Sequence, residues 1–139
     1  MLTGLFDEQF LLKKLDQKTD PLARLNSIVD WQIFLPIIEK ALGRKDSASA
    51  GRKPYSPLLM FKILILQSLY NLSDEGVERE LLKDLLARRF VGLSGRQFGP
   101  DATTIWRFKE ALTKAGLIAT LHETFNRHLD ELGFLAGTC

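Results

Sequence analysis

Residues Pro57 to Asn71, "PLLMFKILILQSLYN", form the densest apolar run of the chain. Lys62, Gln67 and Ser68 interrupt the run, and it is too short to cross a bilayer core of about 30 Å as a helix. Pro57 suits the first position of a helix, because its fixed φ is helical and no partner is needed there for its missing N–H. The run therefore predicts a helix buried at the centre of a globular core.

On both sides of this run, apolar residues recur at intervals of three and four, which is the period of amphipathic helices rather than of strands. Asp20 and Pro21 form a helix start, and Asp30 can cap "WQIFLPIIEKAL", which Pro36 should kink and Gly43 should end. Further helices are predicted near residues 8–15, 73–90, 101–115 and 117–132. We therefore predict an all-α fold, a compact multi-helix domain without a sheet.

The composition fits a single domain over residues 1–139. Hydrophobic residues make up 45% of the chain and charged residues 26%, with nine Phe and two Trp, which is enough apolar material for a core. The only cysteine is Cys139, so no disulfide framework and no cysteine-based metal site can form within one chain. The amino terminus lacks the pattern of a signal peptide. We therefore expect the protein to lie in a reducing cytoplasm and to have no membrane partner.

The net charge of +2 is small, but the basic residues are unevenly distributed. Residues 44–53 carry a net +3, and residues 81–116 carry a net +4. The first of these lies in "GRKDSASAGRKPYSP", which predicts a mobile basic loop over residues 43–57 because Gly, Ser, Ala and Pro dominate it. Concentrated positive charge favours a polyanionic partner.

The second basic region contains "FGPDATTIWRFKEAL", Phe98 to Leu112, in which Asp101 is a natural N-cap. A helix from Asp101 should bury a stripe formed by Ile105, Phe108 and Leu112. The opposite face then carries Thr103, Arg107, Glu110 and Lys114, and the flanks carry Thr104, Trp106 and Lys109. Hydroxyls and a guanidinium at the amino end of a projecting helix are typical of the DNA-reading helix in a helix-turn-helix-like unit.

The residue types suggest a division of roles on double-stranded DNA. Arginine can pair with guanine through two hydrogen bonds, and threonine can reach a base edge or a thymine methyl group. The predicted base contacts are Thr103, Thr104 and Arg107, and the predicted phosphate contacts are Lys109, Arg96, Arg52 and Lys53. Periodicity alone leaves a second interpretation open, in which the threonines are ordinary first-turn residues and Arg107 is merely solvated.

Other constellations do not indicate catalysis. "GLSGRQFG" lacks the spacing and the Lys-Ser/Thr ending of a P-loop, and His122 and His128 lie six positions apart, off one helical face. Asp74, Glu75 and Glu78 lie near a helix start, where the helix dipole already favours acids. The sequence therefore predicts no catalytic residue, no metal site, no cofactor and no small-molecule substrate.

Two linked motifs carry a family resemblance. "KPYSPLLMFKILILQSLYNLSDEGVERELLKDLLARRFVGL" followed by "GPDATTIWRFKEAL" closely resembles the amino-terminal domain of bacterial insertion-sequence transposases of the DDE type, over roughly residues 20–137. The family pattern falls on Pro100, Asp101, Thr104, Ile105, Phe108 and Lys109. The resemblance implies a helical domain that binds the terminal inverted repeats of its element and precedes an RNase H-like catalytic domain.

The resemblance also bears on catalysis. Family members usually continue into a strand that carries the first catalytic Asp, whereas this chain ends at "LAGTC", and Cys139 does not match that continuation. The resemblance implies a non-catalytic, truncated piece whose active-site carboxylates would lie beyond residue 139, bound to DNA in the nucleoid. One alternative is an oligomerisation module, which would form a homo-oligomer or assemble with full-length transposase. A second is a truncated regulator of that enzyme. The least favoured alternative is an autonomous metal-dependent nuclease.

Overall fold

Seven α-helices, one 3-10 helix and no strand make up residues 20–43 and 55–133, the part of the chain that the computed structural model describes. The all-α prediction is confirmed for these residues. The elements are α2 (Pro21–Ile28), η1 (Trp31–Phe34, the 3-10 helix), α3 (Leu35–Leu42), α4 (Pro57–Tyr70), α5 (Asp74–Lys83), α6 (Leu85–Val91), α7 (Ala102–Lys114) and α8 (Ile118–Glu131).

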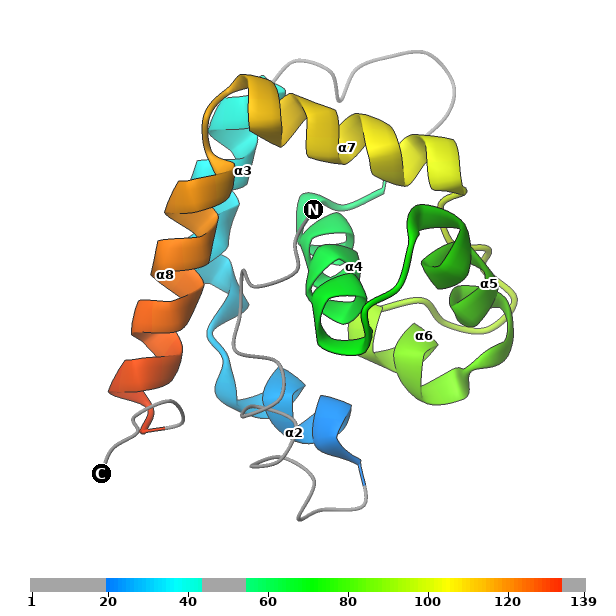
Figure 1. The fold of residues 1–139 in the computed structure, drawn as a ribbon. Helices are drawn as coiled ribbons and strands as arrows, with labels where there is room; N and C mark the ends of the chain where they lie inside the picture. The colour runs from blue at the N-terminus through cyan, green and yellow to red at the C-terminus, as the bar shows by residue number, and fades with distance from the viewer. Residues whose placement is uncertain (1–19, 44–54, 134–139) are drawn as a thin grey trace.

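Helix α4 is the centre of the fold, with α3 and α8 on one side, α5 and α6 on the other, and α7 across one end (Figure 1). Ten of its fourteen residues are buried, as the apolar run predicts. The Ser56 hydroxyl caps the helix by accepting hydrogen bonds from the amides of Leu58 and Leu59, and Asn71 ends it with a φ of 55°. A helix buried on all sides needs no amphipathic pattern, which explains its nearly continuous apolar sequence.

Aromatic rings join the helices around α4. Phe34 of η1 and Phe61 of α4 lie 4.8 Å apart between ring centroids, and Trp31 lies within 6.4 Å of both Phe90 of α6 and Phe125 of α8. The ammonium of Lys62 lies over the Trp31 ring, 4.9 Å from its centroid, and burial lowers the pKa of Lys62. Lys62 is therefore part of the packing at the edge of the core.

Two predicted helices are each divided in the structure. The helix expected after Asp30 is the 3-10 helix η1 followed by α3, with Pro36 in the first turn of α3 rather than at a kink. The single helix expected over residues 73–90 is broken at Asp84, which ends α5 and caps α6 by accepting hydrogen bonds from the amides of Leu86 and Ala87. In α6, Phe90 is buried against Trp31 of the aromatic cluster.

Several helix starts follow the prediction. The carboxylate of Asp20 accepts a hydrogen bond from the amide of Ala23, and the Ser73 hydroxyl accepts one from the amide of Gly76. The predicted helix near residues 8–15, residues 44–54 of the predicted loop, and Cys139 lie outside the described residues. Within residues 20–43 and 55–133, no helix combines the length and the apolarity that a membrane crossing requires.

Candidate nucleic-acid interface

Helix α7 buries one stripe and leaves the opposite face exposed. Ile105, Phe108 and Leu112 are buried, as the periodicity predicts. The Asp101 carboxylate caps the helix by accepting a hydrogen bond of 2.9 Å from the amide of Thr104. This hydrogen bond and a second one from the Thr104 hydroxyl hold the pKa of Asp101 below its usual value. The start of α7 is therefore fixed by its own cap.

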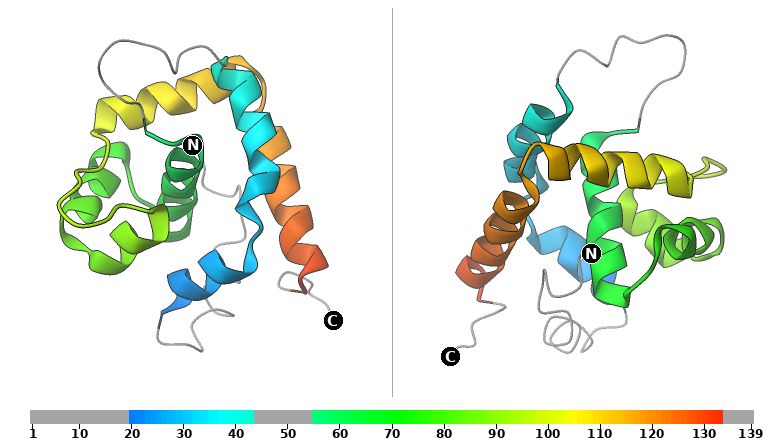
Figure 2. Two further views of the ribbon diagram at one scale, coloured as in Figure 1. Left: turned by 180° about the vertical axis from the view of Figure 1, so that it is seen from behind. Right: turned by 45° about the horizontal axis from the view of Figure 1, so that its top comes forward.

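Helix α5 holds the amino-terminal half of α7 from below. A Glu78 carboxylate oxygen accepts a hydrogen bond of 2.9 Å from the amide of Ala102, the first residue of α7. Two turns further along α7, the Lys109 ammonium lies 2.6 Å from a carboxylate oxygen of Asp74 in a half-buried ion pair. At its other end α7 contacts α3, and it runs across the top of the molecule in Figure 1 and in the left view of Figure 2. The helix is thus fastened along its length.

The structure separates the four polar candidates of α7 into two pairs. Thr103 and Arg107 lie exposed on the outward face, one helical turn apart, and Lys114 continues the same face toward the carboxyl end. Thr104 and Lys109 are half-buried at the flanks, Thr104 bonded to Asp101 and Lys109 paired with Asp74. Arg107 attracts the nearby Asp101 carboxylate electrostatically, and both outward side chains remain exposed to a partner.

The two flanks of α7 differ in charge. Asp74 and Glu75 of α5 border a shallow hollow of about 210 Å³ together with Thr103 and Trp106 of α7. The carboxylates of Asp74 and Glu75 on that flank repel phosphates. Lys109 neutralises only one of these two carboxylates, that of Asp74. A polyanion would therefore be favoured over the Arg107 side of the helix.

The loop before α7 carries Arg96 and is held by contacts that the sequence pattern did not reveal. The guanidinium of Arg88 donates hydrogen bonds of 2.7 to 3.0 Å to three backbone carbonyls, those of Leu81, Gly95 and Gln97. Arg96 itself is exposed. No sequence signal distinguishes Arg88 from its exposed neighbour Arg89, since both appear only as basic residues at the end of a helix.

Arg52 and Lys53 lie outside the described residues, but the residues that flank their segment are placed. Gly43 ends α3, whose carboxyl end lies beside the carboxyl end of α7 in Figures 1 and 2. On the other side, the Tyr55 hydroxyl donates a hydrogen bond of 3.1 Å to the Phe98 carbonyl, four residues before α7 begins. The two attachment points therefore lie near opposite ends of α7.

Other polar residues have structural roles. The Nε2 atom of His128 accepts a hydrogen bond from the amide of Asp30, which fastens α8 to the turn before η1. Among the described residues, no group of three or more His, Cys, Asp or Glu side chains could hold a metal ion.

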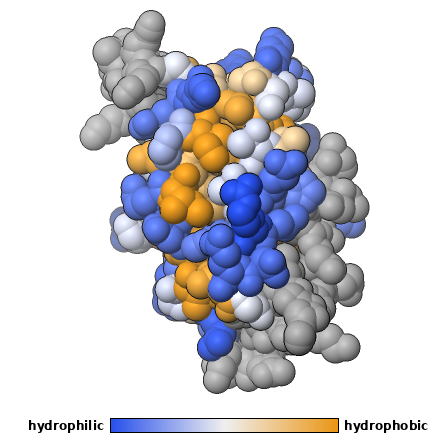
Figure 3. All heavy atoms as spheres, turned by 90° about the vertical axis from the view of Figure 1, so that its left-hand side faces the viewer, coloured by the Kyte–Doolittle hydropathy of each residue, from blue (hydrophilic) through white to orange (hydrophobic). Residues whose placement is uncertain are grey.

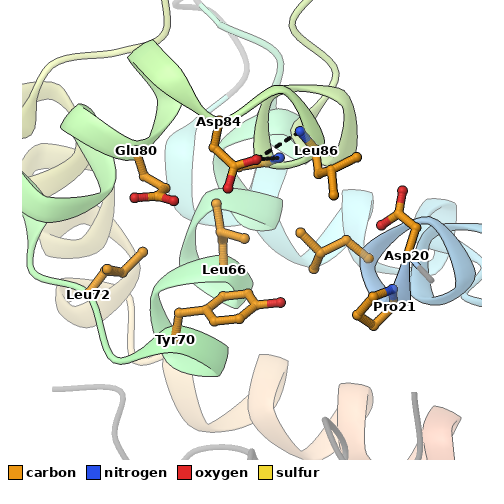
Figure 4. A pocket seen from close by; sticks show the side chains of 10 residues that line it. Asp20, Pro21, Leu66, Tyr70, Leu72, Glu80, Asp84 and Leu86 are labelled. Carbon is orange, nitrogen blue, oxygen red and sulfur yellow. Dashed lines mark hydrogen bonds between the residues drawn. The ribbon is translucent and has the colours of Figure 1, made fainter. Parts of the chain in front are cut away.

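A cavity of about 190 Å³ lies between α2, α4, α5 and α6, at the end of α4 away from α7 (Figure 4). Its walls include Leu66, Tyr70 and Leu72, together with the carboxylates of Asp20 and Asp84, which cap α2 and α6. Both of these carboxylates already accept hydrogen bonds from backbone amides in their caps. The polar face of α7 is therefore the stronger candidate for a functional site.

A match to a known protein family shows the broad class of protein to which this chain belongs. The family described as Transposase domain (DUF772) matches residues 9–111, a range that ends inside α7. The chain belongs to this transposase family. No solved structure matches the chain. Family membership supports a role in transposition, and the predicted resemblance to transposases is confirmed at this level.

Proposed function

We propose that this transposase domain binds the terminal inverted repeats of its element and that α7 is the helix that reads them. The observation that carries the proposal is the outward face of α7, where Thr103 and Arg107 are exposed on a helix that other contacts already fasten. Arg107 makes no ion pair with any described residue. An α-helix fits the major groove of DNA, and an exposed arginine there can pair with a guanine edge.

The phosphate contacts that we propose lie around this face. Arg96 in the anchored loop and Lys114 on α7 are exposed cations that would position the helix on the duplex. Arg52 and Lys53 remain proposed phosphate contacts, because their segment is attached near both ends of α7. Lys109 remains a weaker one, since a phosphate would have to compete with Asp74 for its ammonium.

The helices around α7 support a helix-turn-helix-like reading of the same region. Helix α5 underlies α7 through the Glu78 and Lys109 contacts, and α6 with the anchored loop forms the connection between them. In a helix-turn-helix unit the supporting helix crosses the backbone while the second helix enters the major groove. We assign these two roles to α5 and α7.

A binding titration tests the function directly. The chain is titrated against duplexes of the terminal repeats and against scrambled duplexes of equal length, at several salt concentrations. We expect binding to the repeats to be at least about tenfold tighter, with affinity falling linearly in the logarithm of salt concentration as counterions are released. Equal, salt-insensitive binding to both duplexes would contradict the proposal.

We also propose that this stretch of the transposase does not itself cut DNA. Its most prominent acids hold the fold: Asp84 and Asp101 are caps, Asp74 pairs with Lys109, and Glu78 holds the start of α7. Cleavage by two metal ions needs carboxylates that hold the ions about 4 Å apart. Incubation of supercoiled plasmid with the chain and magnesium or manganese should leave it intact. Nicking that disappears in Asp101→Asn or Asp74→Asn would show the opposite.

A second candidate function is self-association, because apolar side chains are exposed away from α7. Leu82, Leu85 and Leu86, at the junction of α5 and α6, are 57%, 62% and 39% exposed. Apolar patches also interrupt the hydrophilic surface on the side where α3 and α8 lie (Figure 3). If these surfaces join copies of the chain, sedimentation should show salt-insensitive oligomers that Leu85→Glu dissociates. Oligomers that persist unchanged in that variant would exclude the leucines.

A further inference from the structure

The most exposed of the large apolar side chains in the described residues is that of Phe98, at 71%. We propose that Phe98 inserts against a base step at the edge of the DNA site, partly unstacking it, and so contributes to choosing the target sequence. The proposal rests on the function proposed for α7. A phenylalanine this exposed forgoes the burial that the core residues obtain, and a partner that covered its ring would recover that stabilisation.

The backbone on both sides of Phe98 is held in place. Its own carbonyl accepts the hydrogen bond from the Tyr55 hydroxyl, and the carbonyl of the preceding Gln97 accepts a hydrogen bond of 2.7 Å from Arg88. Gly99 is packed so closely that an added Cβ would lie 3.1 Å from a Leu93 methyl carbon. Phe98 is therefore an exposed ring on an anchored loop, and inserting it costs little ordering of the backbone.

Phe98 lies close to the start of the proposed reading helix. Three residues separate it from Ala102, the first residue of α7, so the two are at most about 14 Å apart along an extended chain. That reach corresponds to about four base pairs at the rise of about 3.4 Å per pair. Arg96, two residues earlier, is exposed and can hold a phosphate beside the ring.

The neighbourhood of Phe98 favours DNA over a protein partner. The four residues before it, Ser94 to Gln97, are all exposed, and none of them is apolar apart from glycine. A single aromatic side chain among polar and basic residues fits a wedge between base pairs, which DNA-bending proteins form with Phe, Leu, Ile or Met. A protein interface needs a contiguous apolar area, and the leucines of the α5–α6 junction offer one elsewhere.

The other exposed aromatic residue near this face provides a contrast. Trp106 is 53% exposed, but it borders the hollow that Asp74 and Glu75 line. These carboxylates disfavour a phosphate backbone close to Trp106, whereas Phe98 has Arg96 as its exposed neighbour. Trp106 is therefore the matched control for Phe98.

The test uses terminal-repeat duplexes in which 2-aminopurine replaces one adenine at a time, because its fluorescence rises when it is unstacked. The full chain should raise the fluorescence severalfold at one position near the edge of the site. Phe98→Ala should abolish the rise and weaken binding about tenfold, whereas Phe98→Leu should retain most of both. Trp106→Ala should leave the rise in fluorescence in place, and circular dichroism melting should confirm that each variant folds.

The outcomes separate the two proposals. If the unchanged chain binds the repeats without raising the fluorescence of 2-aminopurine at any position, the proposed insertion of Phe98 is wrong, and the proposed role of α7 stands. The same conclusion follows if Phe98→Ala raises the fluorescence equally. If the unchanged chain binds no duplex, both proposals fail. If Phe98→Ala leaves DNA binding intact but dissociates an oligomer in sedimentation, Phe98 is a protein contact and the insertion is overturned.

Discussion

Helices α4 and α7 have similar lengths, fourteen and thirteen residues, and each starts at a side-chain cap, yet they are buried very differently. Ten residues of α4 are buried, whereas α7 buries only Ile105, Phe108 and Leu112. Packing therefore accounts for nearly every residue of α4. Packing does not account for Thr103 and Arg107, which the fold leaves exposed on a fastened helix. The outward residues of α7 are therefore the ones that we propose for contact with DNA.

The largest loss of stability should come from a substitution that leaves a cavity in the core at α4. Ile65 is fully buried, so Ile65→Ala removes its packing and leaves a cavity, which should lower the free energy of unfolding by about 2 to 5 kcal/mol. Urea denaturation followed by circular dichroism measures this. Leu85→Ala, at a site 62% exposed, is the control and should change stability by less than about 0.5 kcal/mol. Equal losses in the two variants would contradict the burial pattern.

A smaller loss of stability should follow when the hydrogen bond between α5 and α7 is removed. Glu78→Ala removes the acceptor of the Ala102 amide in a part-buried hydrogen bond and should cost about 1 to 3 kcal/mol of stability. Arg79→Ala, at the next and exposed position of α5, is the matched control and should have little effect. Hydrogen exchange at the start of α7 should quicken in Glu78→Ala alone. Unchanged exchange there would show that the Asp101 cap suffices to hold the helix.

A third effect depends on pH, through the cap of α7. Because hydrogen bonds from Thr104 lower the pKa of Asp101 in the folded state, the ionised cap stabilises the fold above the ordinary aspartate pKa of about 4. This contribution is lost as the pH falls through the lower, folded-state pKa. Asp101→Ala should therefore lower Tm at pH 7, by less than Ile65→Ala does, and the difference from the unchanged chain should vanish in strong acid. A difference that grows in acid would contradict the sign of the pKa shift.

The sequence predicts the parts of this molecule that depend on local patterns. The period of the apolar residues and the cap residues Ser73 and Asp101 mark helix faces and starts, and the outward position of Arg107 follows from the same period. The break at Asp84 was not predicted, because no Gly or Pro marks it and an Asp within a helical pattern is a weaker signal, although Asp84 caps α6 in the structure. Local sequence patterns alone therefore do not locate every helix end.

The supports of the candidate site were missed for a similar reason. The Glu78 and Ala102 contact joins residues 24 apart, and the Tyr55 and Phe98 contact joins residues 43 apart. Neither spacing has a sequence period, so these residues were read as a first-turn acid and as loop residues. The ion pair between Lys109 and Asp74 also joins two helices, so the sequence pattern of α7 alone could not reveal that Lys109, predicted as a phosphate contact, is already paired.

The most direct test of the role of α7 is a binding comparison of two arginine variants at one salt concentration. Arg107 on α7 and Arg127 on α8 are both exposed, so Arg107→Ala and Arg127→Ala remove the same charge from different helices. Fluorescence anisotropy should show that Arg107→Ala weakens binding to the terminal repeats by about 1 to 3 kcal/mol, with a much smaller loss on scrambled duplex. Arg127→Ala should bind both duplexes as the unchanged chain does. Equal losses for the two variants on both duplexes would contradict the assignment of α7 as the reading helix.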